Sequence, residues 1–256
     1  MDLIAHLVGA ASRCYDGSLP SCERQEGESV DTIPTVYQPL HYPETDGKPM
    51  GETDVHIDAL IYLREALRDH FRDAPQIYVA GNIFLYYEEG NPTACVAPDV
   101  FMVQGVDKHE RRTYRLWEEG QPPAVVFEIT SRGTRLEDLG TKRAVYAMLG
   151  VQEYFVYDPL GEYLRPPLQG YRLHEGEYQR MPPAGEEGLT SQVLGLGLRV
   201  EAGRLRVVDL ATGERLLTPA EVYAARRAEA TANRVAEVEA ELERLRAELA
   251  RLRGGA

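Results

Sequence analysis

Two acidic residues and one lysine in the middle of the chain stand out because of their positions. Asp99 opens an apolar run, and Glu128 lies 29 residues later, within the most apolar stretch of the sequence. Lys142 follows 14 residues after Glu128, on the apolar stripe of a segment with helical periodicity. A buried carboxylate is costly unless it is paired, protonated or bound to a metal ion. These three residues are therefore candidates for a shared site.

Their chemistry points to metal-assisted hydrolysis of a phosphodiester. Carboxylate oxygens are hard ligands that suit Mg²⁺ or Mn²⁺, and such an ion polarises a phosphoryl oxygen and lowers the pKa of a bound water. Lys142 would orient that water or stabilise the charge that develops on the phosphate. A simpler interpretation stays open: Glu128 forms an ordinary salt bridge, and Lys142 extends to the helix edge or only pairs with Glu128 or Asp138.

Strands and helices are expected around these residues. Apolar, β-branched or aromatic runs at residues 77–80, 83–87, 99–103, 124–130 and 153–157 are typical of strands. Helical periodicity covers residues 55–71 and 137–149. The order strand, helix, strand over residues 124–157 predicts a parallel pair of strands. Residues 170–209 favour a small antiparallel edge.

Four motifs together resemble the Uma-two family of restriction endonucleases, within the PD-(D/E)XK nuclease superfamily. They lie at residues 98–101, 126–131, 135–146 and 149–159, and the resemblance covers roughly residues 40–210. It implies an α/β fold: a restriction-endonuclease-like mixed β-sheet core flanked by helices, followed here by a coiled-coil-like C-terminal helix. Asp99 and Glu128 match the two acids of the family. The usual superfamily lysine would stand two residues after the second acid, where this chain has Thr130. The resemblance instead places the lysine on the following helix, at Lys142.

Glu52 and His56 stand where the first predicted helix begins. Some superfamily members place an extra acid there, so Glu52 is a candidate ligand for a second metal ion or for a metal-bound water. An acid at a helix start is also stabilised by the helix dipole alone, and this simpler role stays open. We expect His56 at the surface or behind the metal ligands.

Basic residues near the predicted site are candidates for contacts with nucleic-acid phosphates. Those we favour are Arg111, Arg112, Arg132, Arg135 and Arg143; Lys108 and Arg115 lie close to them in the sequence. Ordinary surface charges are the alternative interpretation. The net charge of −13 disfavours non-specific binding of nucleic acid by the whole surface. We therefore expect local, salt-sensitive binding of DNA, with RNA as the open alternative.

Composition places the chain among globular proteins of a reducing compartment. The 256 residues are 43% hydrophobic and 27% charged, which excludes global disorder. We find no apolar run of about 18 residues and no secretory signal, so no membrane partner is expected. Three cysteines without a CxxC pair argue against a disulfide framework. These features predict a cytoplasmic protein.

The C-terminal segment carries a heptad pattern. Its apolar positions are Val235, Val238, Leu242, Leu245, Leu249 and Leu252, and the flanking pairs Arg234–Glu239, Glu241–Arg246 and Glu248–Arg253 have opposite charges. This pattern predicts a homo-oligomer through parallel self-association, with a lone charged helix or a frayed tail as alternatives. We divide the chain into a flexible N-terminal extension (1–36), a nuclease domain (37–212) and a helical tail (213–256).

Two functions are compatible with these observations. The first is a divalent-metal-dependent endonuclease that hydrolyses DNA, with Asp99, Glu128 and Lys142 as catalytic residues and Mg²⁺ or Mn²⁺ as cofactor. The second is a catalytically weak or inactive oligomeric module of the same fold that binds nucleic acid or protein. The displaced lysine and the acidic surface favour the second.

Overall fold

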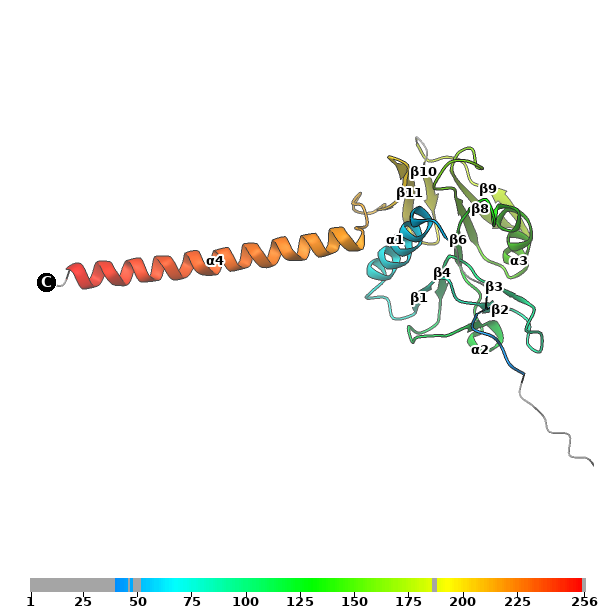
Figure 1. Ribbon diagram of the computed structural model, residues 1–256, viewed down its shortest axis with the longest axis horizontal. Helices are drawn as coiled ribbons and strands as arrows, with labels where there is room; N and C mark the ends of the chain where they lie inside the picture. The colour runs from blue at the N-terminus through cyan, green and yellow to red at the C-terminus, as the bar shows by residue number, and fades with distance from the viewer. Residues whose placement is uncertain (1–39, 46, 48–51, 186–187, 255–256) are drawn as a thin grey trace, which may run out of the picture. The chain divides into compact units, whose positions relative to one another are not determined.

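The apolar runs in the middle of the chain form a six-stranded mixed sheet (Figure 1). A computed structural model describes residues 40–45, 47, 52–185 and 188–254. The strand order is β1–β4–β6–β7–β8–β9. The bounds are β1 Ile77–Ala80, β4 Val100–Gln104, β6 Val125–Ile129, β7 Glu153–Tyr157, β8 Leu168–His174 and β9 Glu177–Arg180. Strands β6 and β7 are parallel and the other neighbours are antiparallel, so the predicted mixed sheet and its parallel pair are confirmed.

Helical segments cover opposite faces of this sheet (Figure 1). Helix α1 (Asp54–His70) begins after Thr53, whose side-chain oxygen accepts a hydrogen bond from the backbone N–H of His56. Between β6 and β7, the chain forms a π-helical turn, η1 (Glu137–Thr141), that continues into α3 (Lys142–Met148). The sequence predicted one uninterrupted helix here, and the π-helical turn is the difference.

Strand β6 divides the core because its side chains alternate between the two faces of the sheet. Val125, Phe127 and Ile129 pack in the cluster that contains the buried side of α1. Val126 packs on the opposite face with Tyr146 of α3. All five residues of β6 are buried, as expected for a central strand. Glu128 follows Val126 in the alternation and therefore faces α3.

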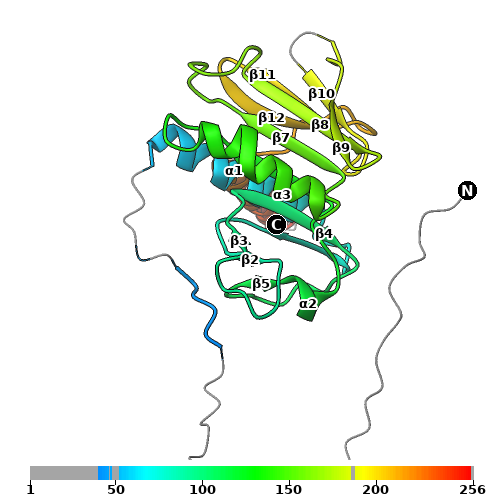
Figure 2. The same cartoon turned by 90° about the vertical axis from the view of Figure 1, so that its right-hand side faces the viewer.

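Two three-stranded sheets complete the core on opposite faces (Figure 2). Strands β10 (Gly188–Ser191), β11 (Leu196–Glu201) and β12 (Arg204–Asp209) form a small antiparallel sheet, whereas the earlier part of the edge expected over residues 170–209 lies in β8 and β9 of the central sheet. Strands β2 (Leu85–Tyr86), β3 (Cys95–Val96) and β5 (Tyr114–Arg115) pair with one another, and α2 (Leu116–Glu119) follows. The strands of this second sheet have only two residues each, too few to show a periodic pattern.

The C-terminal segment is a single helix, α4 (Pro219–Gly254). It starts with a capping box: the Glu221 carboxylate accepts from the Thr218 N–H at 2.7 Å, and the Thr218 hydroxyl accepts from the Glu221 N–H at 3.2 Å. Described side chains from Tyr223 to Arg253 are all exposed. No helix in the described part of the chain is long and apolar enough to cross a membrane. The predicted extension 1–36 lies outside the described residues, and the proposed division into domains stays a prediction.

Candidate active site

Asp99 lies immediately before β4, beside the end of β6. Its Oδ2 accepts a hydrogen bond from the backbone N–H of Ile129 at 2.6 Å. Its Oδ1 is 3.5 Å from Nε2 of His56 on α1. The two contacts fix the carboxylate between the sheet and the start of α1. The Asp99 side chain is 17% exposed, so a ligand can reach it.

Glu128 is the buried carboxylate that the sequence predicted, with only 1% of its surface exposed. Its Oε1 accepts a hydrogen bond from the Tyr146 hydroxyl at 2.5 Å, and its Oε2 accepts one from the Lys142 ammonium at 2.9 Å. Burial raises the pKa of Glu128 well above its usual value; the Lys142 charge opposes this shift, and the Asp99 charge adds to it. Asp99, Glu128 and Lys142 are therefore brought together, as predicted.

Lys142 is shared between two carboxylates. Besides Glu128, its Nζ lies 3.0 Å from Oδ1 of Asp138, a fully buried residue. This second contact is an ion pair only, because neither oxygen of Asp138 has a hydrogen-bond donor among the described residues. Burial tends to lower the pKa of Lys142, but the charges of Glu128 and Asp138 outweigh it and raise the pKa above its usual value. The ammonium therefore stays protonated at neutral pH.

The π-helical turn explains how the residues of this helix converge on Glu128. Asp138, Lys142 and Tyr146 are spaced four residues apart. Four residues of an α-helix make slightly more than one turn. Four residues of the wider π-helical turn make slightly less than one turn. The deviations before and after Lys142 therefore oppose each other, and the three side chains stay close to one line.

His56 is buried between two acids. It is 4% exposed, and its Nδ1 lies 3.3 Å from Oε2 of Glu52 while its other ring nitrogen faces Asp99. Burial alone would lower the pKa of His56, but the hydrogen bond and charge of Asp99 and the charge of Glu52 raise it. The structure thus places His56 in the interior, behind Asp99, and not at the surface. Glu52 contacts the ring nitrogen of His56 that faces away from Asp99. This contact does not support the predicted role of Glu52 as a metal ligand.

The five arginines predicted to contact phosphates differ in their exposure and in the residues that they contact. Arg111 is the clearest case: its side chain is 3% exposed, lies 2.5 Å from Glu119 and 3.0 Å from Asp107, and stacks over Tyr78. A phosphate contact by Arg111 would require breaking these ion pairs. Of the others, Arg112 is exposed and pairs with Glu44, Arg135 lies over Tyr163, Arg143 lies over Tyr171 and Arg132 is exposed.

The donor set fits a hard divalent cation that takes few protein ligands. In the described part of the chain, no group of three or more His, Cys, Asp or Glu side chains is arranged to hold a metal ion by itself. Asp99 and Glu128 supply two carboxylates, and Mg²⁺ commonly uses one or two together with waters and substrate phosphates. Glu128 and Asp138 contact the Lys142 ammonium and Asp99 contacts the His56 ring, so three carboxylates surround one ammonium and one imidazole, and a cation would balance the negative charge that is left.

Comparison with known proteins shows the family of this chain. The family model Uma2, described as "Putative restriction endonuclease", matches residues 37–203. The chain belongs to the Uma2 family. The matched part of this Uma2 chain contains Asp99, Glu128, Asp138 and Lys142. One solved structure that the chain resembles is described as "a putative nuclease belonging to DUF820 from Anabaena variabilis ATCC 29413". It has a TM-score of 0.42 and 12% identity, covering 59% of this chain and 81% of that one. No curated protein matches.

Sequence reasoning missed the roles of two residues in this Uma2 site. The spacing predicts only that Asp138 can pair with Lys142, and it assigns Tyr146 no role in the site. Both lie four residues from Lys142. A signal was present, since a lysine on a buried stripe needs acceptors within one turn, and a buried tyrosine needs a partner for its hydroxyl.

Proposed function

We propose that this Uma2 protein is a divalent-metal-dependent endonuclease that hydrolyses phosphodiester bonds of DNA. The observation that carries the proposal is the sharing of the Lys142 ammonium between Glu128 and Asp138, next to Asp99. A simple structural salt bridge needs one acid for one base, whereas Lys142 contacts two acids here, and the third acid, Asp99, contacts His56. The description of the family as restriction endonucleases supports DNA as the substrate.

A Mg²⁺ or Mn²⁺ ion held by Asp99 and Glu128 would supply Lewis-acid activation of the phosphate and of a bound water. The chain's own residues position these groups. The Ile129 N–H orients the Asp99 carboxylate, and the Tyr146 hydroxyl orients that of Glu128. These contacts fix the two carboxylates before substrate arrives, which reduces the reorganisation needed during reaction.

Asp138 gives Lys142 a second anchor. When Glu128 acts as a ligand, the Asp138 carboxylate, 3.0 Å from Nζ, keeps the ammonium charged and beside the site. Lys142 then donates hydrogen bonds to the oxygen on which negative charge develops during hydrolysis. Because its pKa is raised, Lys142 acts as a cationic hydrogen-bond donor and not as a general base at neutral pH.

Cleavage of supercoiled plasmid tests this proposal. The full chain is incubated with plasmid in Mg²⁺, in Mn²⁺ or in EDTA, and nicked and linear products are measured. We expect cleavage in either metal, none in EDTA, and loss of cleavage in Asp99→Asn. Asp73→Asn changes an exposed acid after α1 and is the matched control, which keeps wild-type activity. A parallel assay on labelled single-stranded RNA distinguishes the substrates. Cleavage that persists in EDTA or in Asp99→Asn would contradict the proposal.

A non-catalytic binding module is the second candidate, and one observation favours it. Both oxygens of Glu128 already accept hydrogen bonds from side chains, as in a purely structural pair. Titration with Mn²⁺ separates the two functions. If the protein is the enzyme, it binds Mn²⁺ and loses this binding in Asp99→Asn. If it is the binding module, it binds no Mn²⁺ and cleaves no nucleic acid.

A further inference from the structure

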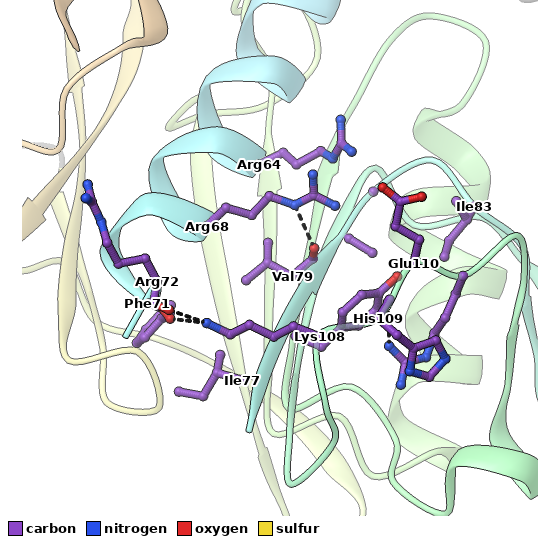
Figure 3. Close-up of a pocket in the computed structure, with 14 residues that line it drawn as sticks. Arg64, Arg68, Phe71, Arg72, Ile77, Val79, Ile83, Lys108, His109 and Glu110 are labelled. Carbon is purple, nitrogen blue, oxygen red and sulfur yellow. Dashed lines mark hydrogen bonds between the residues drawn. The ribbon is translucent and has the colours of Figure 1, made fainter. Parts of the chain in front are cut away.

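A basic cavity adjoins the candidate active site. It has a volume of about 490 Å³ and lies between α1, the end of β1 and the segment of residues 108–111 (Figure 3). Arg64 and Arg68 extend into it from α1 at four-residue spacing, Arg72 lines it just after the helix ends, and Lys108 enters from the opposite side. Residues four apart share one face of a helix, so α1 presents two neighbouring guanidinium groups to the cavity.

Two of these guanidinium groups lack full compensation. The Nη1 atoms of Arg64 and Arg68 lie 3.6 and 3.7 Å from the same oxygen of Glu65, so these two cations share one contacting carboxylate. Glu110 also lines the cavity and its charge acts on Arg68 without an ion pair within 4 Å in the described residues. The Nε of Arg64 is buried and has no hydrogen-bond partner among the described residues. Burial and the nearby charge of Arg64 lower the pKa of Arg68, as expected for adjacent cations. An unsatisfied buried donor is costly, and an anion would satisfy it.

The other two basic groups already have partners. Arg72 pairs with Asp69. The Lys108 ammonium donates to the carbonyl oxygens of Phe71 and Arg72, at 2.5 and 2.9 Å, where α1 ends (Figure 3). Arg68 donates through Nε to the carbonyl of Val79, at 3.0 Å, which leaves its terminal nitrogens for a ligand. The free binding capacity of the cavity is therefore centred on Arg64 and Arg68.

The wall of the cavity touches the backbone of the first catalytic acid. Gly81 lines the cavity, and a Cβ at this position would lie 2.3 Å from the carbonyl oxygen of Asp99. The next residue, Asn82, donates its N–H to the carbonyl of Pro98 at 2.9 Å. A nucleic-acid strand that reaches Asp99 would therefore pass close to this cavity.

We propose that Arg64 and Arg68 bind a backbone phosphate of the nucleic-acid strand, beside the phosphate that is cleaved. This inference rests on the proposed nuclease function and names the surface that holds its substrate. Guanidinium groups match phosphate oxygens with two parallel hydrogen bonds, which explains arginine at both positions. Such a contact positions the strand and carries no sequence preference.

Binding measured without metal tests this site separately from catalysis. Fluorescence anisotropy of a labelled duplex oligonucleotide, in EDTA, gives the Kd of the full chain across a range of salt concentrations. We expect Arg64→Gln/Arg68→Gln to weaken binding at least tenfold at low salt. The slope of log K against log salt should become shallower by about 1–2, since each lost phosphate contact removes roughly 0.9. Arg226→Gln/Arg227→Gln, which removes two exposed charges of α4, is the control and keeps both values.

Three outcomes would overturn the site: no binding by the wild type, an unchanged Kd in the double variant, or an equal loss in the control. Circular dichroism checks that the double variant is folded, and Arg64→Gln alone, which leaves the bond to Val79 intact, should show a smaller loss in the same direction. Plasmid cleavage by the wild type decides the nuclease function independently, because the binding assay contains no metal.

A different observation concerns α4, whose apolar seam has no partner among the residues that the structure describes. The seam residues Val235, Val238, Leu242, Leu245 and Leu249 are 45–55% exposed. They repeat at alternating spacings of three and four, which is the a and d pattern of a coiled coil. Exposed apolar seams of this kind are covered by a second helix.

Charge complementarity identifies the second helix as another copy of α4 in parallel orientation. In a parallel pair, the g position of one chain meets the following e position of the other, which joins Glu241 to Arg246 and Glu248 to Arg253. In an antiparallel pair with the two seams fully overlapped, g positions face g positions, which would set Glu241 against Glu248. We infer that α4 forms a parallel two-stranded coiled coil with a second copy of this chain.

A charge-swap series tests this interface on the full chain by sedimentation equilibrium. The wild type should be a dimer, Glu241→Arg should dissociate more readily because two Arg–Arg contacts replace two ion pairs, and Glu241→Arg/Arg246→Glu should restore the dimer. Glu243→Arg makes the same charge change outside the e and g positions and is the control. A monomeric wild type, a larger oligomer, or equal effects of Glu241→Arg and Glu243→Arg would overturn the inference.

Discussion

Lys142 on α3 reaches across to Glu128 on β6, with Nζ 2.9 Å from Oε2. The lysine that this fold uses thus arrives from the helix and not from the position two residues after Glu128. That position is Thr130, which is 2% exposed and whose hydroxyl oxygen has no hydrogen-bond partner among the described residues. The strand therefore supplies the carboxylate, and the helix supplies the cation that balances it.

Removal of this lysine should destabilise the fold. Lys142→Met leaves Glu128 and Asp138 buried without a counter-charge, which we expect to cost about 3 kcal/mol of unfolding free energy. In the double variant with Glu128→Gln, the loss should be smaller than the sum of the two single losses, because the pair is removed together. Urea unfolding of the four proteins measures this coupling. Strictly additive losses would show that the ion pair does not contribute as a pair.

The hydroxyl of Tyr146 should contribute both to stability and to the site. Tyr146→Phe removes the donor to Oε1 of Glu128, and we expect a loss of about 2 kcal/mol, as for hydrogen bonds to charged groups. Tyr223→Phe alters an exposed tyrosine of α4 and should leave stability unchanged. Thermal or urea unfolding of both variants provides the measurement. Equal stabilities of the two variants would argue against a structural role for this bond.

Gly81 should be irreplaceable even by alanine. An added Cβ would lie 2.3 Å from the Asp99 carbonyl oxygen, a backbone atom that cannot move without displacing the first acid. Gly81→Ala should therefore cost about 1–3 kcal/mol, the usual range for overpacking, and reduce cleavage as well.

Gly140 is the matched control for Gly81. It lies in η1 and has nothing within 4 Å of an added Cβ, so Gly140→Ala should preserve or raise stability by up to about 1 kcal/mol. Urea unfolding and plasmid nicking compare the two variants. If Gly81→Ala retains wild-type stability and activity, the close approach to Asp99 is not a constraint on the site.

The capping box of α4 predicts a pH dependence. Hydrogen bonds from Thr218 lower the pKa of Glu221 below its ordinary value, so Glu221 binds protons less readily in the helix than in the unfolded chain. Its contribution is therefore present above the unfolded value of 4.5 and is lost as the pH falls through the lower folded value. The helical signal at 222 nm should weaken over this range, and Glu221→Gln should flatten the dependence. If the pH dependence of the 222 nm signal is the same in Glu221→Gln as in the wild type, this role of the Glu221 carboxylate is wrong.

The core of the site could be predicted because it depends on local periodicity. Glu128 faces α3 since strand side chains alternate, and Lys142 and Tyr146 share a helix face since they are four residues apart. The parallel pairing of β6 with β7 followed from the helix between them. These relations need no knowledge of distant parts of the chain.

Other features depend on contacts that no periodicity encodes. The π-helical turn that aligns Asp138 with Lys142 widens the helix locally, whereas the sequence pattern of this segment is that of an ordinary α-helix. The ion pair of Arg111 with Glu119 depends on a loop and the short helix α2, so Arg111 looked like a free surface charge. His56 reached the interior because α1 starts beside Asp99, which is a matter of tertiary packing.

The central claim is that the Asp99, Glu128 and Lys142 cluster hydrolyses phosphodiesters, and one variant tests it most directly. Glu128→Gln keeps the size of the side chain and an oxygen that accepts from Tyr146, while Asp138 continues to balance Lys142. The measurement is the initial rate of plasmid nicking in Mg²⁺ by folded wild type and Glu128→Gln at equal concentration. We expect a rate at least about 100-fold lower in the variant, the size of effect expected when a preorganised charge is removed from a site. A Glu128→Gln rate equal to that of the wild type would show that Glu128 takes no part in the hydrolysis.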